Sequence, residues 1–166
     1  MTDPRATRPY MPAYGILTAS EGTGLLPWSW AVERLERSHD YWLGTVWPDA
    51  RPHVVPVWGV WREDALWFSS SKTSRKARNQ AANPHAVMTT DNALEPVVIE
   101  GRVELVVERS AIERFAGWAD ANYSTSYGVD FYAAPGNRCF RLVPTWVFAL
   151  TEADFTGSPT RWKFER

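Results

Sequence analysis

The sequence is poor in cysteine, in net charge and in long apolar runs, and each absence excludes a class of protein. Its single cysteine, Cys139, permits neither an internal disulfide nor a cysteine-cluster zinc site, and we expect a strand residue rather than a catalytic thiol. With 18 Lys and Arg against 19 Asp and Glu, the net charge of -1 provides no general attraction for nucleic acids or anionic membranes. The apolar runs are shorter than the roughly 18 to 20 residues of a membrane helix, and the N-terminus lacks a signal-peptide hydrophobic region. We therefore expect a cytoplasmic protein without nucleic-acid or membrane partners.

Metal binding and familiar catalytic motifs are also missing. The three histidines, His39, His53 and His85, do not have the spacing of metal ligands. The sequence contains no Gly-x-Ser-x-Gly elbow, no Walker glycine pattern and no convincing Cys/His pairing. No catalytic side chain and no metal site are predicted.

The composition is that of a folded globule. The 166 residues are 45% hydrophobic and 14% aromatic, with ten tryptophans, which suits one domain with a real core. Residues 1–24 are rich in Pro, Gly, Thr and Ser and are interpreted as an N-terminal arm, flexible in part. Residues 25–166 are expected to form the single domain.

Local signals predict two or three helices. Ser29 is expected to cap a helix that ends near His39. Ser74 is expected to cap a second, short helix that stops at Asn83 and Pro84, because a residue before proline avoids the helical region. A third is expected to begin at the capping box formed by Ser110 and Glu113.

The rest of the chain has the pattern of strands. Residues 41–47, 52–61 and 65–71 are β-branched and aromatic runs joined by short turns, typical of an antiparallel meander. Residues 85–90 and 96–107 follow as strands, with a bulge expected at Gly101, and residues 138–151 form two pieces interrupted by Pro144. Pro56 lies inside the second run and indicates a bulge, an edge, or a place where something other than a strand lies alongside. Six or seven strands in this order favour a mainly β fold, a closed or partly closed antiparallel barrel with peripheral helices.

The stretch from Ser69 to Asn79, SSSKTSRKARN, concentrates four cations in seven residues. Three of them fall in the first turn of the helix capped by Ser74, where the helix dipole disfavours positive charge. Free N–H groups, hydroxyls and cations at one helix start would together form a cradle for a phosphate. The alternative is a solvated basic helix end without a ligand.

The order of these segments resembles the pyridoxamine 5'-phosphate oxidase-like split-barrel superfamily, in its flavin- or deazaflavin-dependent oxidoreductase branch. The most specific match is the string Ser74, Arg75, Lys76, Asn79, Asn83 and Pro84. The resemblance implies that Arg75 and Lys76 hold the cofactor phosphate. It also implies that the ribityl chain or phosphate contacts Ser69, Ser70 and Lys72, and that the ring lies along Pro56, Val57 and Trp58. The C-terminal Arg161 and Trp162 resemble a tail that approaches the cofactor pocket, although core or interface packing explains Trp162 equally well.

The resemblance implies a homodimer with a flavin-type cofactor, coenzyme F420 or FMN, between its subunits. The expected activity is hydride transfer between the cofactor ring and a small hydrophobic or conjugated substrate, which the cofactor itself makes possible. Oxidation of vitamin B6 is not expected, because no site for the phosphate of that substrate can be recognised. The alternative from another class is a non-catalytic carrier of flavin, F420 or haem.

Overall fold

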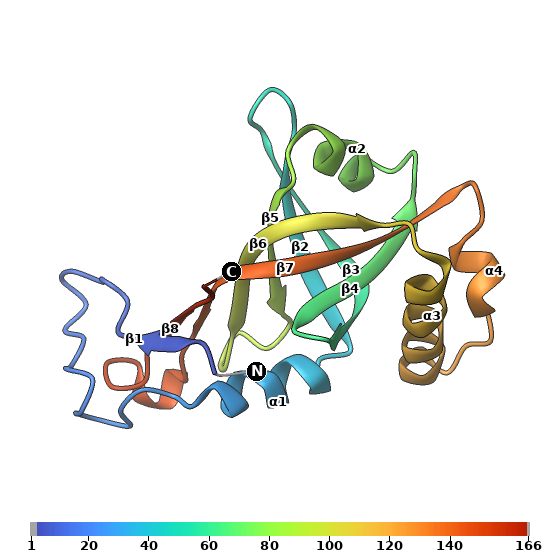
Figure 1. The fold of residues 1–166 in the computed structure, drawn as a ribbon. Helices are drawn as coiled ribbons and strands as arrows, with labels where there is room; N and C mark the ends of the chain where they lie inside the picture. Colours follow the sequence, from blue (N-terminus) through green and yellow to red (C-terminus); the bar gives the residue numbers. More distant parts are fainter. Residues whose placement is uncertain (1–2, 166) are drawn as a thin grey trace.

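A computed structural model describes residues 3–165, which form a mainly β fold with helices at its periphery (Figure 1). The strands are β1 (Arg5–Thr7), β2 (Asp40–Val46), β3 (Pro52–Arg62), β4 (Ala65–Ser71), β5 (His85–Thr90), β6 (Val97–Val106), β7 (Asn137–Ala149) and β8 (Thr160–Lys163). The helices are α1 (Trp28–Arg37), α2 (Arg75–Ala82), α3 (Arg109–Tyr123) and α4 (Gly128–Tyr132), with a 3-10 turn at Glu152–Asp154.

Six antiparallel strands close into a barrel in the order β7, β4, β3, β2, β5, β6 and back to β7. The predicted meander is confirmed as β2, β3 and β4, and β8 and β1 extend the sheet beyond β7. The mainly β, antiparallel barrel expected from the sequence is therefore confirmed. The two short outer strands were not predicted, since three or four residues are too few to show a periodic pattern.

One continuous strand, β7, replaces the two pieces that we predicted around Pro144. It pairs with β6 from Cys139 to Ala149, and the register shifts between Glu100 and Gly101, opposite Pro144. The irregularity accommodates a residue that cannot donate to the ladder, so the proline bends the strand without ending it. Gly101 is required here, because an added Cβ would lie 2.1 Å from the carbonyl oxygen of Val143. The bulge predicted at Gly101 is confirmed.

The three predicted helices are found as α1, α2 and α3, whereas α4 was not predicted and two of the predicted caps are wrong. Helix α1 begins directly after Pro27 and α3 directly after Glu108, and neither has a side-chain cap. Ser29 and Ser110 therefore lie inside the first turns. Proline presets a backbone angle compatible with a helix start, which explains how α1 begins without a hydroxyl cap.

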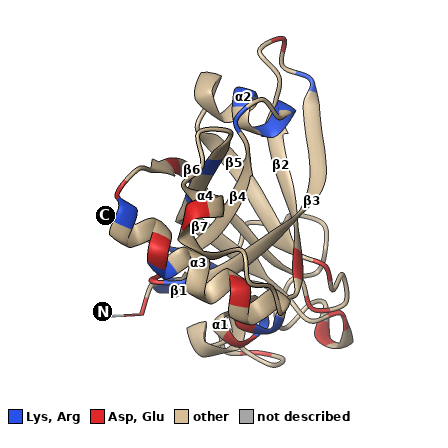
Figure 2. Ribbon diagram, turned by 90° about the vertical axis from the view of Figure 1, so that its right-hand side faces the viewer, with Lys and Arg blue, Asp and Glu red and all other residues tan. Residues whose placement is uncertain are grey.

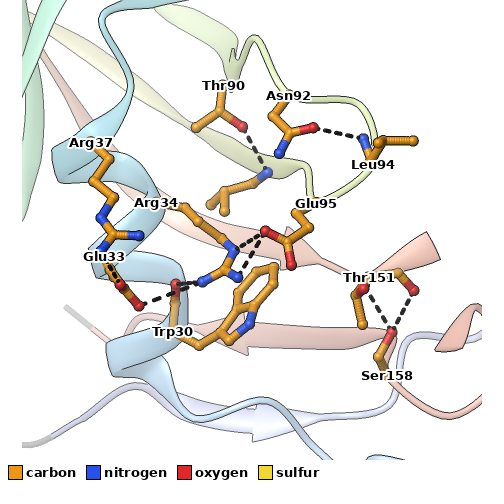
Figure 3. Close-up of polar contacts among 11 residues, drawn as sticks. Trp30, Glu33, Arg34, Arg37, Thr90, Asn92, Leu94, Glu95, Thr151 and Ser158 are labelled. Atoms are coloured by element: carbon orange, nitrogen blue, oxygen red, sulfur yellow. Dashed lines mark hydrogen bonds and ion pairs between the residues drawn. The ribbon is translucent and has the colours of Figure 1, made fainter. Parts of the chain in front are cut away.

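Helix α1 closes one end of the barrel and is tied to the β5–β6 turn (Figure 3). Arg34 donates to Glu95 at 2.8 Å, and its guanidinium lies 3.4 Å from the centre of the Trp30 ring. Trp28 packs its ring against Trp61 and Trp162 in the core.

Helix α3 is held against the barrel by the tyrosine at its C-terminal end. The Tyr123 hydroxyl lies 2.5 Å from the carbonyl oxygen of His39 and 2.9 Å from that of Gly59, and it accepts from the Gly59 N–H at 2.6 Å. The ring of Tyr123 stacks on Trp58 with centroids 4.2 Å apart. Helix α3, through Tyr123, therefore covers one face of the Trp58 ring and holds that side chain in place.

The N-terminal segment joins the sheet through β1, which pairs with β8. Arg8 then donates to the carbonyl oxygens of Thr18, Gly157 and Pro159. Asp154 accepts from the backbone N–H of Thr23 at 2.6 Å, and hydrogen bonding from Thr23 lowers the pKa of its carboxyl. The predicted arm includes residues 1 and 2, which lie outside the described part of the chain.

Candidate functional site

The barrel is split between β3 and β4. These strands pair only through Gly59–Arg62 and Ala65–Phe68, and beyond that point β3 pairs with β2 while β4 pairs with β7. Within residues 3–165, the Pro52–Trp58 segment of β3 therefore has no strand partner on the side of β4. Pro56 lies on this free edge, which confirms the edge interpretation of that proline.

Helix α2 begins where β4 leaves the split. Ser74 is the N-cap predicted from the sequence, and its hydroxyl accepts from the Ala77 N–H at 3.2 Å. The hydroxyl also lies 2.8 Å from that of Ser70, at the end of β4. Among the described residues none accepts from the backbone N–H groups of Arg75 and Lys76, as expected at the first turn of a helix.

The cations of this turn are gathered on one side of the molecule (Figure 2). The Arg75 guanidinium lies 3.6 Å from the centre of the Trp47 ring, and that of Arg51 lies 4.4 Å from the same ring. Desolvation, followed by the charges of Arg78 and Arg51, lowers the pKa of Arg75. Burial likewise lowers the pKa of Lys76. An anion bound at this turn would relieve this crowding of positive charge.

The β2–β3 turn contributes two residues that sequence reasoning missed. Trp47 and Arg51 flank this turn, and Arg51 is paired with Asp49 at 2.9 Å. The pattern identified a turn at this point, but nothing in it shows that the turn folds over α2. Thr45 was also missed, although its hydroxyl accepts from the Asn79 amide at 3.0 Å.

The predicted ring-binding residues divide between two faces of β3. Pro56 and Trp58 point outward, and Trp58 is 48% exposed although one ring face is covered by Tyr123. Val57 points into the barrel and is 7% exposed. Only the outward pair presents side chains to a molecule lying along this edge.

Two other predicted residues lie apart from the cradle around Ser74. Asn79 is fully buried, and its side-chain amide donates to Thr45 of β2. Lys72 is exposed and is among the residues that line a separate hollow beside α2, described below.

The C-terminal residues lie at the far end of β7. Ser70 pairs with Arg138 near the start of β7, whereas Trp162 pairs with Val147 near its end. At about 3.3 Å per residue, these positions are roughly 30 Å apart along the strand. Trp162 is fully buried, and the Arg161 guanidinium lies 4.5 Å from the centre of the Trp146 ring. Within one chain, the structure does not bring Arg161 and Trp162 to the cradle.

The lone cysteine is a buried strand residue, as expected. Cys139 is 1% exposed, and burial raises the pKa of its thiol to about 12. A thiolate nucleophile near neutral pH is therefore disfavoured.

The cradle and the split fit a phosphorylated molecule that has a planar ring. The phosphate would meet two free N–H groups, the hydroxyls of Ser70 and Ser74, and two cations. The ring would lie along the free edge of β3, over Pro56 and beside Trp58.

None of the helices within residues 3–165 is long and apolar enough to cross a membrane. A comparison with curated proteins gives no match.

Several solved structures share the fold. An F420 reductase is 26% identical, with a TM-score of 0.58 over 69% of this chain and 93% of that one.

Two further structures support the fold alone. The conserved hypothetical protein Rv2991 from Mycobacterium tuberculosis is 19% identical, with a TM-score of 0.64 over 90% of this chain and 88% of that one. General Stress Protein 26 from Bacillus anthracis is 15% identical, with a TM-score of 0.60 over 73% of this chain and 91% of that one.

Residues 31–151 match the family model described as pyridoxamine 5'-phosphate oxidase. The chain therefore belongs to the pyridoxamine 5'-phosphate oxidase-like split-barrel superfamily.

Proposed function

We propose that this protein is an oxidoreductase that binds a flavin-type cofactor, F420 or FMN, in the split between β3 and β4. The observation that carries the proposal is the meeting of the cradle at Arg75 and Lys76 with a free strand edge. When bound, the cofactor supplies the hydride-transfer chemistry. The chain would hold the phosphate at α2, orient the ring along Pro56 and Trp58, and exclude water from it.

F420 is the cofactor that we favour. One protein that shares this fold is an F420 reductase. F420 also carries more negative charge than FMN, and Arg51 and Arg78 add cations next to Arg75. A ligand with several anionic groups would draw on more of them than a single phosphate can.

We further propose that the cofactor lies between two copies of the chain. The outer face of β2, β3 and β5 exposes large apolar side chains, among them Trp42 (45%), Val54 (59%) and Trp58 (48%). A groove of about 510 Å³ crosses this face between Trp42, Val54 and Val87. Contiguous apolar surface of this kind marks an interaction site. In such a dimer the partner's tail could supply Arg161 to the cofactor, although it lies far from the cradle of its own chain.

The activity is tested by anaerobic mixing of the protein with reduced F420, and separately with reduced FMN, using menadione as a conjugated acceptor. Oxidation of the cofactor faster than in the absence of protein is expected, and it should be lost in the Arg75→Gln/Lys76→Gln variant. A carrier, the alternative from another class, would bind the cofactor and leave its oxidation rate unchanged. Light scattering of wild type and Val54→Glu tests the dimer separately, since only the wild type should have twice the monomer mass.

A further inference from the structure

A second hollow lies on the other side of α2 from Arg75. It has a volume of about 540 Å³ and is enclosed by α2, β6 and β7. Its apolar walls come from Ala77 and Ala81 of α2, Val103 and Leu105 of β6, and Phe140 of β7. Leu105 is 50% exposed although it lies in a strand of the barrel. The hollow is large enough for a small organic molecule, and its walls are mainly apolar.

The mouth of this hollow carries two cations that have no carboxylate partner. Lys72 and Arg138 line it together, and the ion pairs found within residues 3–165 include neither of them. Among residues 3–165, Arg138 donates to the carbonyl oxygens of Pro135 and Asn137 alone, at 3.4 and 2.8 Å. The two strand ends are held side by side, because the Lys72 N–H donates to the Gly136 carbonyl at 2.9 Å. None of the described residues that line the hollow is acidic.

A buried polar side chain also borders the hollow. Gln80 is 6% exposed, and both polar atoms of its amide lack a hydrogen-bond partner among the described residues. Unpaired buried amides are rare in folded proteins and cost free energy. Both amide atoms are covered from solvent, so Gln80 adds no accessible polar group to the walls of the hollow.

From these features we infer that the hollow is a binding site for a small amphipathic anion, distinct from the cofactor cradle. The anionic head, a carboxylate or a phosphate, would lie between Lys72 and Arg138. An alkyl or aryl body would replace water along Leu105 and Phe140. Lys72 is one of the residues for which the resemblance implies a cofactor contact, and here we infer a role for it at this hollow. The inference does not depend on the oxidoreductase proposal, because none of its residues belongs to the cradle at Arg75 and Lys76.

The site is tested by calorimetric titration of the full chain with octanoate and with octyl phosphate. We expect binding of one molecule per chain, and the tighter of the two ligands identifies the preferred head group. Arg138→Gln should weaken binding about fivefold, the upper range for a partly exposed ion pair. Ala81→Phe should abolish it by filling the hollow from an exposed helix position.

Two variants serve as controls. Arg102→Gln removes an exposed cation from β6, the strand that also carries Val103 and Leu105, and should leave the affinity unchanged. Arg75→Gln/Lys76→Gln should also retain binding, which separates this site from the cradle even if no flavin-type cofactor binds. The inference is overturned if neither ligand binds, if Ala81→Phe binds as wild type does, or if the loss occurs only in the cradle variant. Thermal unfolding of each variant verifies that it is folded.

Discussion

Replacement of Arg75 and Lys76 by glutamine should separate cofactor binding from folding. Both side chains lie at the first turn of α2, where they repel Arg78 and oppose the helix dipole. If they hold a phosphate, each charge-assisted contact is worth about tenfold or more in affinity. The double variant should therefore bind FMN or F420 about 100-fold more weakly, with some departure from additivity because the residues are neighbours.

The same variant should remain folded. No ion pair of either residue is found within residues 3–165, and the contact of Arg75 with Trp47 is a minor packing interaction. We expect the midpoint of thermal unfolding to shift by no more than about 2 °C, as for ordinary surface substitutions in a chain of this size. The shift can have either sign, since lost repulsion offsets lost packing.

The assay is quenching of tryptophan fluorescence on titration with each cofactor, beside a thermal melt of the same sample. Arg37→Gln is the matched control, because it removes an exposed helical cation whose partner is Glu33 in its own helix. An equal loss of affinity in the control would mean that Arg75 and Lys76 do not hold the phosphate. The same conclusion follows if the double variant unfolds to the extent that it stops binding.

Three further predictions concern the framework of the site. Tyr123→Phe removes the hydroxyl that ties α3 to His39 and Gly59, and it should lower the free energy of unfolding by about 1 to 3 kcal/mol. Urea denaturation measures this change, and an unchanged denaturation midpoint would show that the hydroxyl does not hold α3 in place. Gly101→Ala places a Cβ against the Val143 carbonyl and should cost about 3 kcal/mol or more, whereas Gly117→Ala, in open space on α3, should cost nothing. The lowered pKa of Asp154 means that its contribution to stability is present at neutral pH and is lost as the pH falls. The Thr23 hydroxyl, which also donates to this carboxyl, is the largest cause of the lowering, so Thr23→Val should raise the midpoint of Asp154 in an NMR titration. An unchanged midpoint would exclude the hydroxyl as the main cause.

Local chemistry accounts for the parts of the site that the sequence could predict. The hydroxyl of Ser74 and the proline at 84 define both ends of α2, because a cap and a helix stop each act within one turn. Pro56 marked the free edge of β3 for the same reason, since a missing N–H is a property of the residue itself.

The parts that could not be predicted depend on contacts between distant segments. Nothing near Trp47 in the sequence indicates that its ring lies against Arg75, 28 positions later, because the turn folds over α2 only in three dimensions. Pro144 suggested a break in β7, and the strand continues because its pairing with β6 shifts register next to this proline. The hollow that Lys72 lines is formed with β6 and β7, whose residues lie far from position 72 in the sequence.

The central claim is that the start of α2 and the free edge of β3 hold a flavin-type cofactor. The most direct measurement is a parallel titration of the purified protein with FMN and with F420, followed by its tryptophan fluorescence. We predict saturable quenching by at least one of the two, stronger for F420, that is lost in Arg75→Gln/Lys76→Gln. Binding of neither cofactor, or binding that this double substitution leaves intact, would contradict the account.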